Sequence, residues 1–369
     1  MALQYERINR HGTEAASVTG CDEQSVRTLF VLPEISETLV GPENSGSKEM
    51  LPVREIAAHA LEGKRGLEEV SLPETIEVIR PFAFHSCPDL HILKLHDSVV
   101  DFYDGAVRQC NQIEEIEITF HKKNRFHLLK DMVNDSDQAM PFLLHFPAEE
   151  GEPFDYIDPN GQHYISASLT FPSFADNYEE DTFSCSMHEK IEGSGYAARQ
   201  HVSREQIDFL FYDRLFPRLT YDEPASAVDA AFRRLMYPYR LTEEAEEQYR
   251  TYLYEHSPEI LPRLIRGRKE ARFGHEGELI WIPNDEAHTL RRLHFLCGEK
   301  LIRQEAIGAA LQALSEIQNP TFTAVIMEYQ YHVLQHAKPQ TPEKVEPEAV
   351  SESPSPQGTA FDSFDLDEL

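Results

Sequence analysis

A 23-residue repeat between Val53 and Phe120 constrains this chain more than any other feature. Apolar residues recur at the same positions of each unit, so that they form columns when the units are aligned. The columns are Ile56, Ile79 and Phe102; Leu67, Leu90 and Ile113; Val70, Leu93 and Ile116; and Leu72, Leu95 and Ile118. A unit this short cannot bury its apolar face alone, so neighbouring units must stack and share one core. The repeat therefore predicts a short solenoid.

Each repeat unit is expected to contribute to two walls of that solenoid. The Leu-x-x-Val-x-Leu segments alternate between inward and outward positions, as a short strand of a stacked parallel sheet does. The Ile-x-x-x-Ala-Leu/Phe segments would form the opposite wall. There the small side chains of Ala60, Ala83 and Ala106 would allow the coils to approach closely.

The second unit, "VIRPFAFHSCPDLHILKLHDSV", resembles the leucine-rich repeats of the BspA-like type. That type reads roughly Ile-Gly-x-x-Ala-Phe-x-x-Cys-x-x-Leu-x-x-Val-x-Leu-Pro. The first unit departs from it because Lys64 replaces the cysteine, and the third departs at Phe102 and Val107. The resemblance implies protein–protein interaction through an extended face that contains no embedded active site. Repeats of this type often belong to surface proteins.

The pattern of apolar residues changes twice after the repeats. Between Tyr164 and Phe171 apolar and polar residues alternate, which predicts a half-buried strand, and Asp158-Pro159-Asn160-Gly161 has turn chemistry. From Ser203 onward the period is helical. We therefore predict an α/β repeat solenoid followed by a small β-containing region and an α-helical domain. The expected parts are an irregular N-terminus (1–25), the solenoid (26–135), a small β-rich region (136–202), a helical domain with antiparallel hairpins (203–336) and a disordered acidic tail (337–369).

Helix starts can be predicted from capping residues. Ser203-x-x-Gln206 fits the capping-box pattern, in which a side chain accepts a bond from a free backbone N–H, and Ser226-x-x-Asp229 is expected to open another helix. Thr242, Ser257-Pro258 and Asp285 are expected to begin three further helices.

The charge balance argues against polyanionic partners. The chain has 34 basic and 64 acidic residues, a net charge of −30, which repels nucleic acid and anionic membrane surfaces. The first residues lack the apolar core of a secretory signal, and no apolar run is long enough to span a bilayer. The five cysteines are scattered, which suits a reducing compartment. We expect a cytoplasmic protein without a cofactor or metal.

The outward positions of the predicted repeat strands form two rows on the concave face of the sheet. They are Glu69, Ile92 and Glu115, and Ser71, Lys94 and Glu117. This mildly acidic surface with one apolar spot is interpreted either as a partner-binding face or as a merely solvated sheet. Cys87 and Cys110 would stack on adjacent coils, but no second ligand pair has zinc-site spacing, so packing explains them better.

One further segment contains candidate ligand-binding residues. It holds Gly193-Ser194-Gly195 and, around it, His188, Tyr196, Arg199 and His201. The segment lacks the lysine of a P-loop and is not a nucleophile elbow. It is interpreted either as a tight glycine turn or as a small anion or peptide site around Arg199. In the second case the chain would be a small-ligand-binding protein or an enzyme with a deep pocket there.

The C-terminal third contains a basic patch and an acidic tail. The patch comprises Arg263, Arg266, Arg268, Lys269 and Arg272, and is interpreted as a solvated helix face or a dock for an acidic partner. The tail ends in "FDSFDLDEL", where acids alternate with Phe361, Phe364, Leu366 and Leu369. Such an end is either a linear docking peptide or a frayed, solubilising terminus. An intramolecular contact between tail and patch is one candidate.

These observations lead to three functional hypotheses. The favoured one is a non-catalytic intracellular adaptor that binds protein partners through the repeat face, the helical hairpins and the tail. The second is the ligand-binding protein or enzyme centred on His188–His201. The third, nucleic-acid binding by the basic helix, conflicts with the charge of the whole chain.

Overall fold

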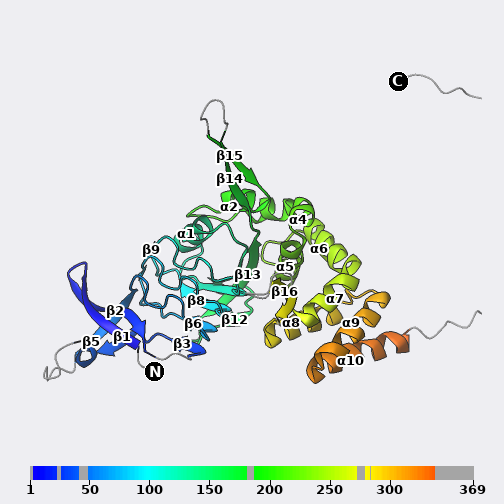
Figure 1. Ribbon diagram of the computed structural model, residues 1–369, viewed down its shortest axis with the longest axis horizontal. Helices are drawn as coiled ribbons and strands as arrows, with labels where there is room; N and C mark the ends of the chain where they lie inside the picture. Colours follow the sequence, from blue (N-terminus) through cyan, green and yellow to red (C-terminus); the bar gives the residue numbers. More distant parts are fainter. Residues whose placement is uncertain are drawn as a thin grey trace, which may run out of the picture.

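In the computed structural model, the Leu-x-x-Val-x-Leu segments lie side by side as parallel strands of one sheet (Figure 1). The structure describes residues 3–22, 26–40, 49–180, 187–271, 279–282 and 284–336. Val70 lies opposite Leu93, and Leu93 opposite Ile116, as the repeat columns predict. The seven strands follow the order β12 (Tyr156–Ile157), β13 (His163–Phe171), β11 (Met140–Pro147), β10 (Glu115–Thr119), β8 (Ile92–His96), β6 (Glu69–Ser71) and β3 (Thr28–Phe30).

A second sheet forms the opposite wall of the solenoid. Ile56, Ile79 and Phe102 are paired across adjacent parallel strands, again as their column predicts. The strands of this wall are β1 (Leu3–Arg10), β2 (Thr13–Cys21), β5 (Met50–Ile56), β7 (Val78–Ile79) and β9 (Asp101–Phe102), with β4 (Glu34–Ser36) paired to β5 and the short 3₁₀ helix η1 (Glu37–Leu39) beside it.

The N-terminus is not irregular, so this prediction is wrong for residues 3–21. They form an antiparallel hairpin, and its second strand, β2, pairs in parallel with β5 and extends the second wall. His11 and Gly12 adopt positive φ angles of 52° and 83°, as a two-residue hairpin turn requires. Ala16 and Val18 are fully buried, and they cover the end of the solenoid core.

The two walls enclose one apolar core. Ile79, Leu93 and Ile116 are fully buried, as each shared column predicts. Cys87 and Cys110 are buried too, and each thiol lies close to a carbonyl of the preceding coil: Cys87 Sγ is 3.1 Å from Leu61 O, and Cys110 Sγ is 3.0 Å from Phe84 O. Both cysteines therefore contribute to the packing of successive coils.

The predicted small β-rich region continues the solenoid sheet and does not form a separate unit. β11 pairs in parallel with β10, and β13 returns antiparallel to β11. One buried cluster runs without a break from Ala16 to Tyr212. It takes in the short helices α1 (His127–Asp135), α2 (Gly195–Gln200) and α3 (Phe209–Arg214), while the hairpin of β14 (Ala175–Glu180) and β15 (Met187–Glu192) projects away from the body (Figure 1).

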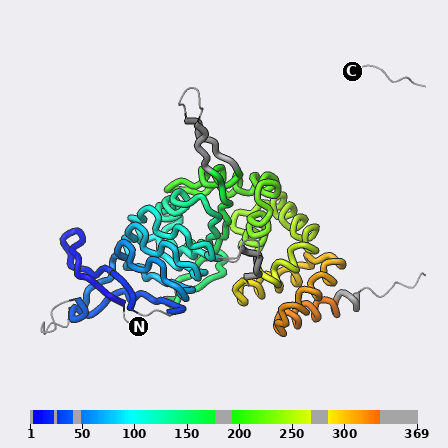
Figure 2. The backbone as a smooth tube through the Cα atoms, viewed as in Figure 1, coloured from blue at the N-terminus to red at the C-terminus, as the bar shows by residue number. Residues whose placement is uncertain are grey.

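A second buried cluster runs from Phe216 to Ile326, so the two cores divide near residue 215 and not at residue 203. It belongs to a region of antiparallel helices that follows the solenoid (Figure 2). The helices are α4 (Phe216–Asp222), α5 (Pro224–Met236), α6 (Glu243–Glu255), α7 (Ser257–Arg266), α8 (Glu286–Gly298), α9 (Gln304–Ile317) and α10 (Pro320–His336), with the hairpin of β16 (Arg268–Ala271) and β17 (Leu279–Ile282) between α7 and α8.

The predicted helix starts hold where a cap is followed by a buried apolar face. Thr242 accepts a bond from the Ala245 amide, and Asp285 one from the His288 amide. Ser203 does not cap a helix, because its hydroxyl accepts from the amides of residues 205 and 206 in a local turn, and Asp208 caps α3 instead. Ser226 does not open a helix either, because α5 begins at Pro224. Asp229 lies inside α5, where it pairs with Arg233 and Arg292.

No helix in the described ranges is both long and apolar enough to cross a membrane.

Candidate functional site

The six predicted face residues lie in two rows across the solenoid sheet. Glu69, Ile92 and Glu115 are direct neighbours in the register of β6, β8 and β10. Ser71, Lys94 and Glu117 form the next row. The residues between the rows face the core, because strand side chains alternate. The structure thus brings the predicted residues together on one face.

A ladder of charged and polar side chains crosses this face. Lys94 Nζ lies 2.9 Å from a Glu69 carboxylate oxygen and 3.9 Å from one of Glu117. Glu117 Oε1 is 3.3 Å from His145 Nε2, and His145 Nδ1 is 2.8 Å from the Ser166 hydroxyl. We call Glu69, Lys94, Glu117 and His145 the charge ladder. It connects four neighbouring strands, from β6 to β11, through side chains alone.

The charge ladder stabilises the ionised forms of Lys94 and Glu117. Burial alone would lower the pKa of Lys94, but the hydrogen bond to Glu69 and the charges of Glu117 and Glu69 outweigh it, and the pKa is raised. Burial alone would raise the pKa of Glu117, but the hydrogen bond with His145 and the charges of His145 and Lys94 lower it. Both groups therefore remain charged near neutral pH.

The lowered pKa of Glu117 predicts a pH dependence of stability. As pH falls, Glu117 of the unfolded chain is protonated before Glu117 of the folded chain. The contribution of Glu117 to stability is therefore fully present above pH 4.5, its pKa in the unfolded chain, and is lost as pH falls through the lower pKa of the folded state. As pH is lowered from about 5 to 3, the midpoint temperature of thermal unfolding should fall more steeply for the wild type than for the Glu117→Gln variant. The exposed Glu150→Gln serves as the control. A Glu117→Gln slope equal to that of the wild type would contradict the assignment.

Glu115, which was predicted to bind a partner, is bound by an arginine of the same chain. It is 8% exposed, and Nη1 of Arg233 in α5 lies 3.2 Å from its carboxylate. The same Nη1 donates to the Ser168 hydroxyl at 3.0 Å, and Nη2 donates to the Glu114 carbonyl at 2.5 Å. α5 therefore covers this end of the face, which sequence alone did not reveal.

The rest of the face is open, and it includes an apolar residue beyond the six that the repeat predicts. Phe30, in β3, lies opposite Ser71 and is 59% exposed, while its neighbours Leu29 and Val31 are buried. The alternation of Leu29 and Val31 was a usable signal, since it implies an outward residue between them. We define the open face as Phe30, Glu69, Ser71, Ile92 and Lys94.

The alternative ligand site does not assemble around Arg199. This residue is 2% exposed, and its guanidinium donates to the main-chain carbonyls of Val133, Gln138, Pro172 and Gly195. Arg199 thus joins α1, α2 and the two ends of the β11–β13 hairpin, and its hydrogen bonds are directed at backbone oxygens.

The other residues of that alternative lie apart. Tyr196 is 39% exposed and contacts Phe174, whereas the His201 ring stacks on Phe211 with the centroids 3.2 Å apart. His188 belongs to β15, where it pairs with Glu179, and its side chain is outside the described residues.

Packing accounts for the glycine in the same segment. A Cβ atom at Gly195 would lie 2.2 Å from the carbonyl oxygen of Pro172 and 2.3 Å from that of Ser173. Real contacts of this kind are not that short, so only glycine fits. The Gly-Ser-Gly sequence leads from a strand into a helix, and its glycine permits close backbone approach.

The basic residues do not share one helix face. α7 ends at Arg266, and Gly267, with a φ of 89°, turns the chain into β16, which contains Arg268 and Lys269. Arg266 binds Glu316 through two contacts of 2.6 and 2.8 Å, while Arg263 is exposed. Arg272 and the tail residues Phe361, Phe364, Leu366 and Leu369 lie outside the described residues, so contact between tail and patch stays a prediction.

Within the described part of the chain, no three His, Cys, Asp or Glu side chains are grouped so that they could hold a metal ion.

Comparison with known proteins identifies the repeat. Residues 50–126 match the family described as BspA type leucine rich repeat region. No curated protein matches the chain. Among solved structures, a leucine rich cell surface protein from Faecalibacterium prausnitzii A2-165 aligns at 13% identity with a TM-score of 0.22 over 32% of this chain. The alignment covers 44% of that protein's length, and so low a score carries no argument about fold or function. The repeat segment of this chain, residues 50–126, therefore belongs to the BspA-type leucine-rich repeats.

Proposed function

We propose that the protein is a non-catalytic interaction protein that binds a partner protein on the open face. The observation that carries the proposal is that the same sheet face already holds a helix. α5 lies on its far end, and Arg233 pairs with the outward carboxylate of Glu115. Glu69 occupies the equivalent position two strands away and is only half-buried. A partner segment can use the open face as α5 uses the covered end.

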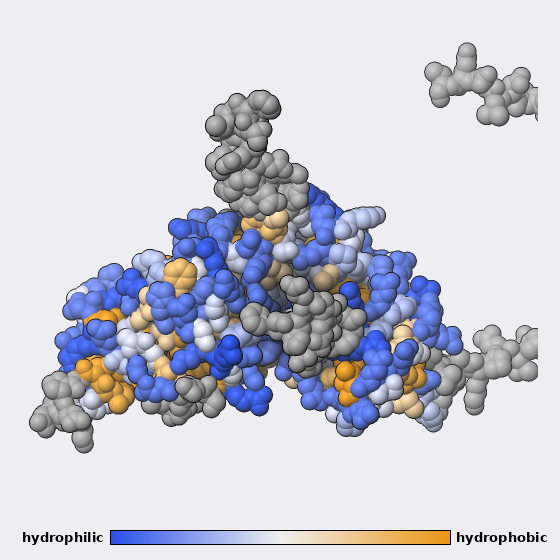
Figure 3. All heavy atoms as spheres, viewed as in Figure 1, coloured by the Kyte–Doolittle hydropathy of each residue, from blue (hydrophilic) through white to orange (hydrophobic). Residues whose placement is uncertain are grey.

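The chemistry of the open face indicates what such a partner must offer. Glu69, which already pairs with Lys94, has room on its carboxylate to accept from a further basic side chain, and Phe30 and Ile92 suit an apolar one. Elsewhere the visible surface is mostly hydrophilic with small scattered apolar patches (Figure 3). We propose a partner that presents a basic residue beside an apolar one.

We further propose an intracellular adaptor role. Cys21, Cys87, Cys110 and Cys297 are free thiols, which suits a reducing compartment. The covered end of the sheet holds the helical region in place next to the open face, so one chain presents two kinds of surface. A pocket for catalysis around Arg199 finds no support, because that guanidinium is bound to main-chain carbonyls.

Affinity purification with matched variants tests the proposal. Phe30→Ala/Ile92→Arg replaces both large apolar side chains of the open face, the second by a charge. Leu39→Ala/Met50→Arg replaces two exposed apolar side chains outside the open face in the same way. Partner proteins recovered with the wild type should fall roughly tenfold with the first variant and stay unchanged with the second, as for an interface hot spot. Circular dichroism confirms that both variants fold. Equal recovery with both would overturn the proposal.

A further inference from the structure

A groove in the helical region has the shape and chemistry of a peptide site. It has a volume of about 780 Å³ and lies between α4, α5, α6 and α7. Val228, Phe232, Ile260 and Leu264 supply apolar side chains to its lining. Leu264 and Ile260 also belong to the second buried cluster, so the apolar floor of the groove is continuous with the core of the helical region.

Aromatic residues add to the groove an exposed apolar rim. Tyr221 is 88% exposed, although it is a large side chain at the groove's edge, and Tyr252 lines the same space. Exposed aromatic side chains around a concave apolar surface are typical of binding sites for apolar or aromatic groups.

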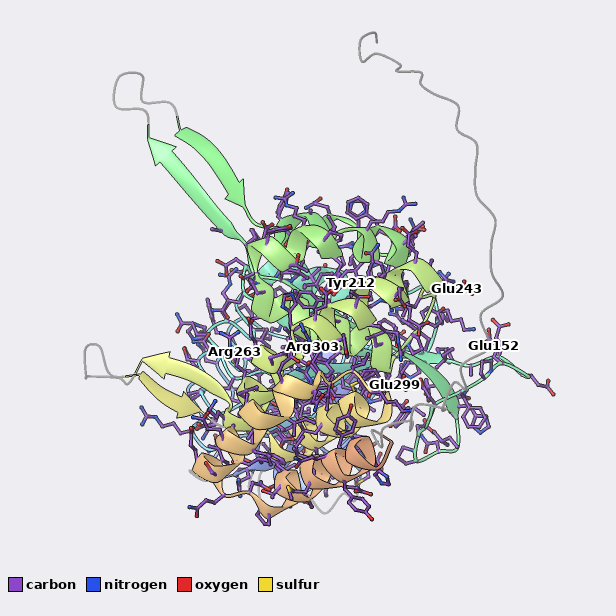
Figure 4. The ribbon with its side chains drawn as sticks, turned by 90° about the vertical axis from the view of Figure 1, so that its right-hand side faces the viewer. Glu152, Tyr212, Glu243, Arg263, Glu299 and Arg303 are labelled. Atoms are coloured by element: carbon purple, nitrogen blue, oxygen red, sulfur yellow. The ribbon has the colours of Figure 1, made fainter. Side chains whose placement is uncertain are left out.

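The remaining feature is positive charge at the rim. Arg263 lines the groove, is exposed, and has no ion pair or side-chain hydrogen bond in the described part of the chain. Figure 4 shows Arg263 beside the β16–β17 hairpin, whose first strand contains Arg268 and Lys269. In a chain with a net charge of −30, the exposed guanidinium of Arg263 favours an acidic ligand.

We propose that residues 361–369 of this chain occupy the groove. Their sequence, FDSFDLDEL, combines two phenylalanines and two leucines with four acidic residues. The phenylalanines fit the apolar floor, and the acids fit Arg263. No other surface named above combines an apolar floor with a basic rim.

The tail follows a helix that packs in the same region as the groove. The last described helix, α10, ends at His336 and packs on α8 and α9, and α9 packs on α7. Residues 337 to 360 number 24, and a flexible chain of that length has a root-mean-square span of about 25–30 Å. A tethered segment binds at a high local concentration, so modest intrinsic affinity is enough for occupancy. The inference concerns a different surface from the open face and does not depend on it.

Competition with a labelled peptide tests the inference on the full chain. A fluorescein-labelled peptide of residues 357–369 is titrated with protein, and fluorescence anisotropy reports binding. The wild type should bind it weakly because its own segment occupies the groove. Phe361→Ala/Phe364→Ala in the protein should free the groove and tighten peptide binding about tenfold, as removing an intramolecular competitor does.

Two further arms locate the site. In the Phe361→Ala/Phe364→Ala background, Val228→Glu/Arg263→Glu should abolish peptide binding, whereas Val100→Glu/Lys122→Glu, the same changes on the solenoid, should not. A peptide with both phenylalanines replaced by alanine should bind no variant. Equal affinity for the wild type and the Phe361→Ala/Phe364→Ala protein, unchanged binding by the groove variant, or no binding at all would each overturn the inference.

Discussion

Arg233→Met is expected to lower the free energy of unfolding by about 3–5 kcal/mol, because it takes the close partner from the buried Glu115 and one of the two arginines from Asp229. Arg233 is 3% exposed. Its Nε is 2.9 Å from Asp229, and its Nη1 is 3.2 Å from Glu115. Methionine fills similar space but cannot compensate either charge. Urea unfolding followed by circular dichroism measures the loss.

Arg291→Met is the matched control for this prediction. Arg291 also approaches Glu115, at 3.9 Å, but its side chain is 45% exposed. An exposed pair of this kind contributes about 0–1 kcal/mol. If both variants lost the same stability, burial of the Arg233 pair would not be what holds α5 on the sheet.

Asp213→Ala should have an effect of the same size, about 3–5 kcal/mol, since it removes one partner of a buried pair. The two oxygens of Asp213 accept from Arg234 at 2.8 and 3.0 Å, and both side chains are 1% exposed or less. The Tyr249 hydroxyl donates to the same carboxylate at 2.8 Å. Alanine leaves a buried guanidinium and a buried hydroxyl without this acceptor. Thermal and urea unfolding give the change in stability.

Asp222→Ala controls for the loss of a carboxylate from the helical region. Asp222 pairs with Arg218 one helical turn away, at 3.1 Å, and its side chain is 29% exposed. Its removal should change stability by about 0.3–0.5 kcal/mol. A loss for Asp213→Ala no larger than this would show that the buried pair contributes little.

The two arginines explain why one end of the sheet is covered. Consecutive residues of an α-helix point about 100° apart. Arg233 therefore reaches the sheet at Glu115, while Arg234 reaches Asp213 in α3. α5 is fixed from two sides, and the rest of the face is left open to a partner.

The solenoid could be predicted from sequence because its information is local and periodic. Each column, such as Val70, Leu93 and Ile116, repeats the same choice of an apolar residue at a constant spacing, and the register follows from it. Helix starts at Thr242 and Asp285 were predictable for a similar reason, since a cap acts within three residues.

The N-terminal hairpin could not be predicted in this way. In β1 two charged residues separate Tyr5 from Ile8, and the strand is only partly buried, so its apolar signal is weak. The turn at His11-Gly12 was the available signal, because two positive φ angles favour such a pair. Pairing of β2 with β5 depends on residues far apart in the sequence.

The contact between α5 and Glu115 could not be predicted from the sequence for a different reason. The sequence shows Arg233 as one charged residue among many on an amphipathic helix. Whether it is solvated or buried depends on Glu115, 118 positions away, and no local pattern connects the two. The repeat predicts the positions of the six face residues on the sheet, but it does not indicate that Glu115 is bound by Arg233.

Site-specific photo-crosslinking tests the central claim, that a partner protein binds the open face, most directly. A benzophenone amino acid replaces Ile92 on the open face or, as the control, His59, whose side chain is 57% exposed on the opposite wall. We expect a crosslinked partner protein from position 92 and none from position 59. No adduct from position 92, or the same adducts from both positions, would contradict it.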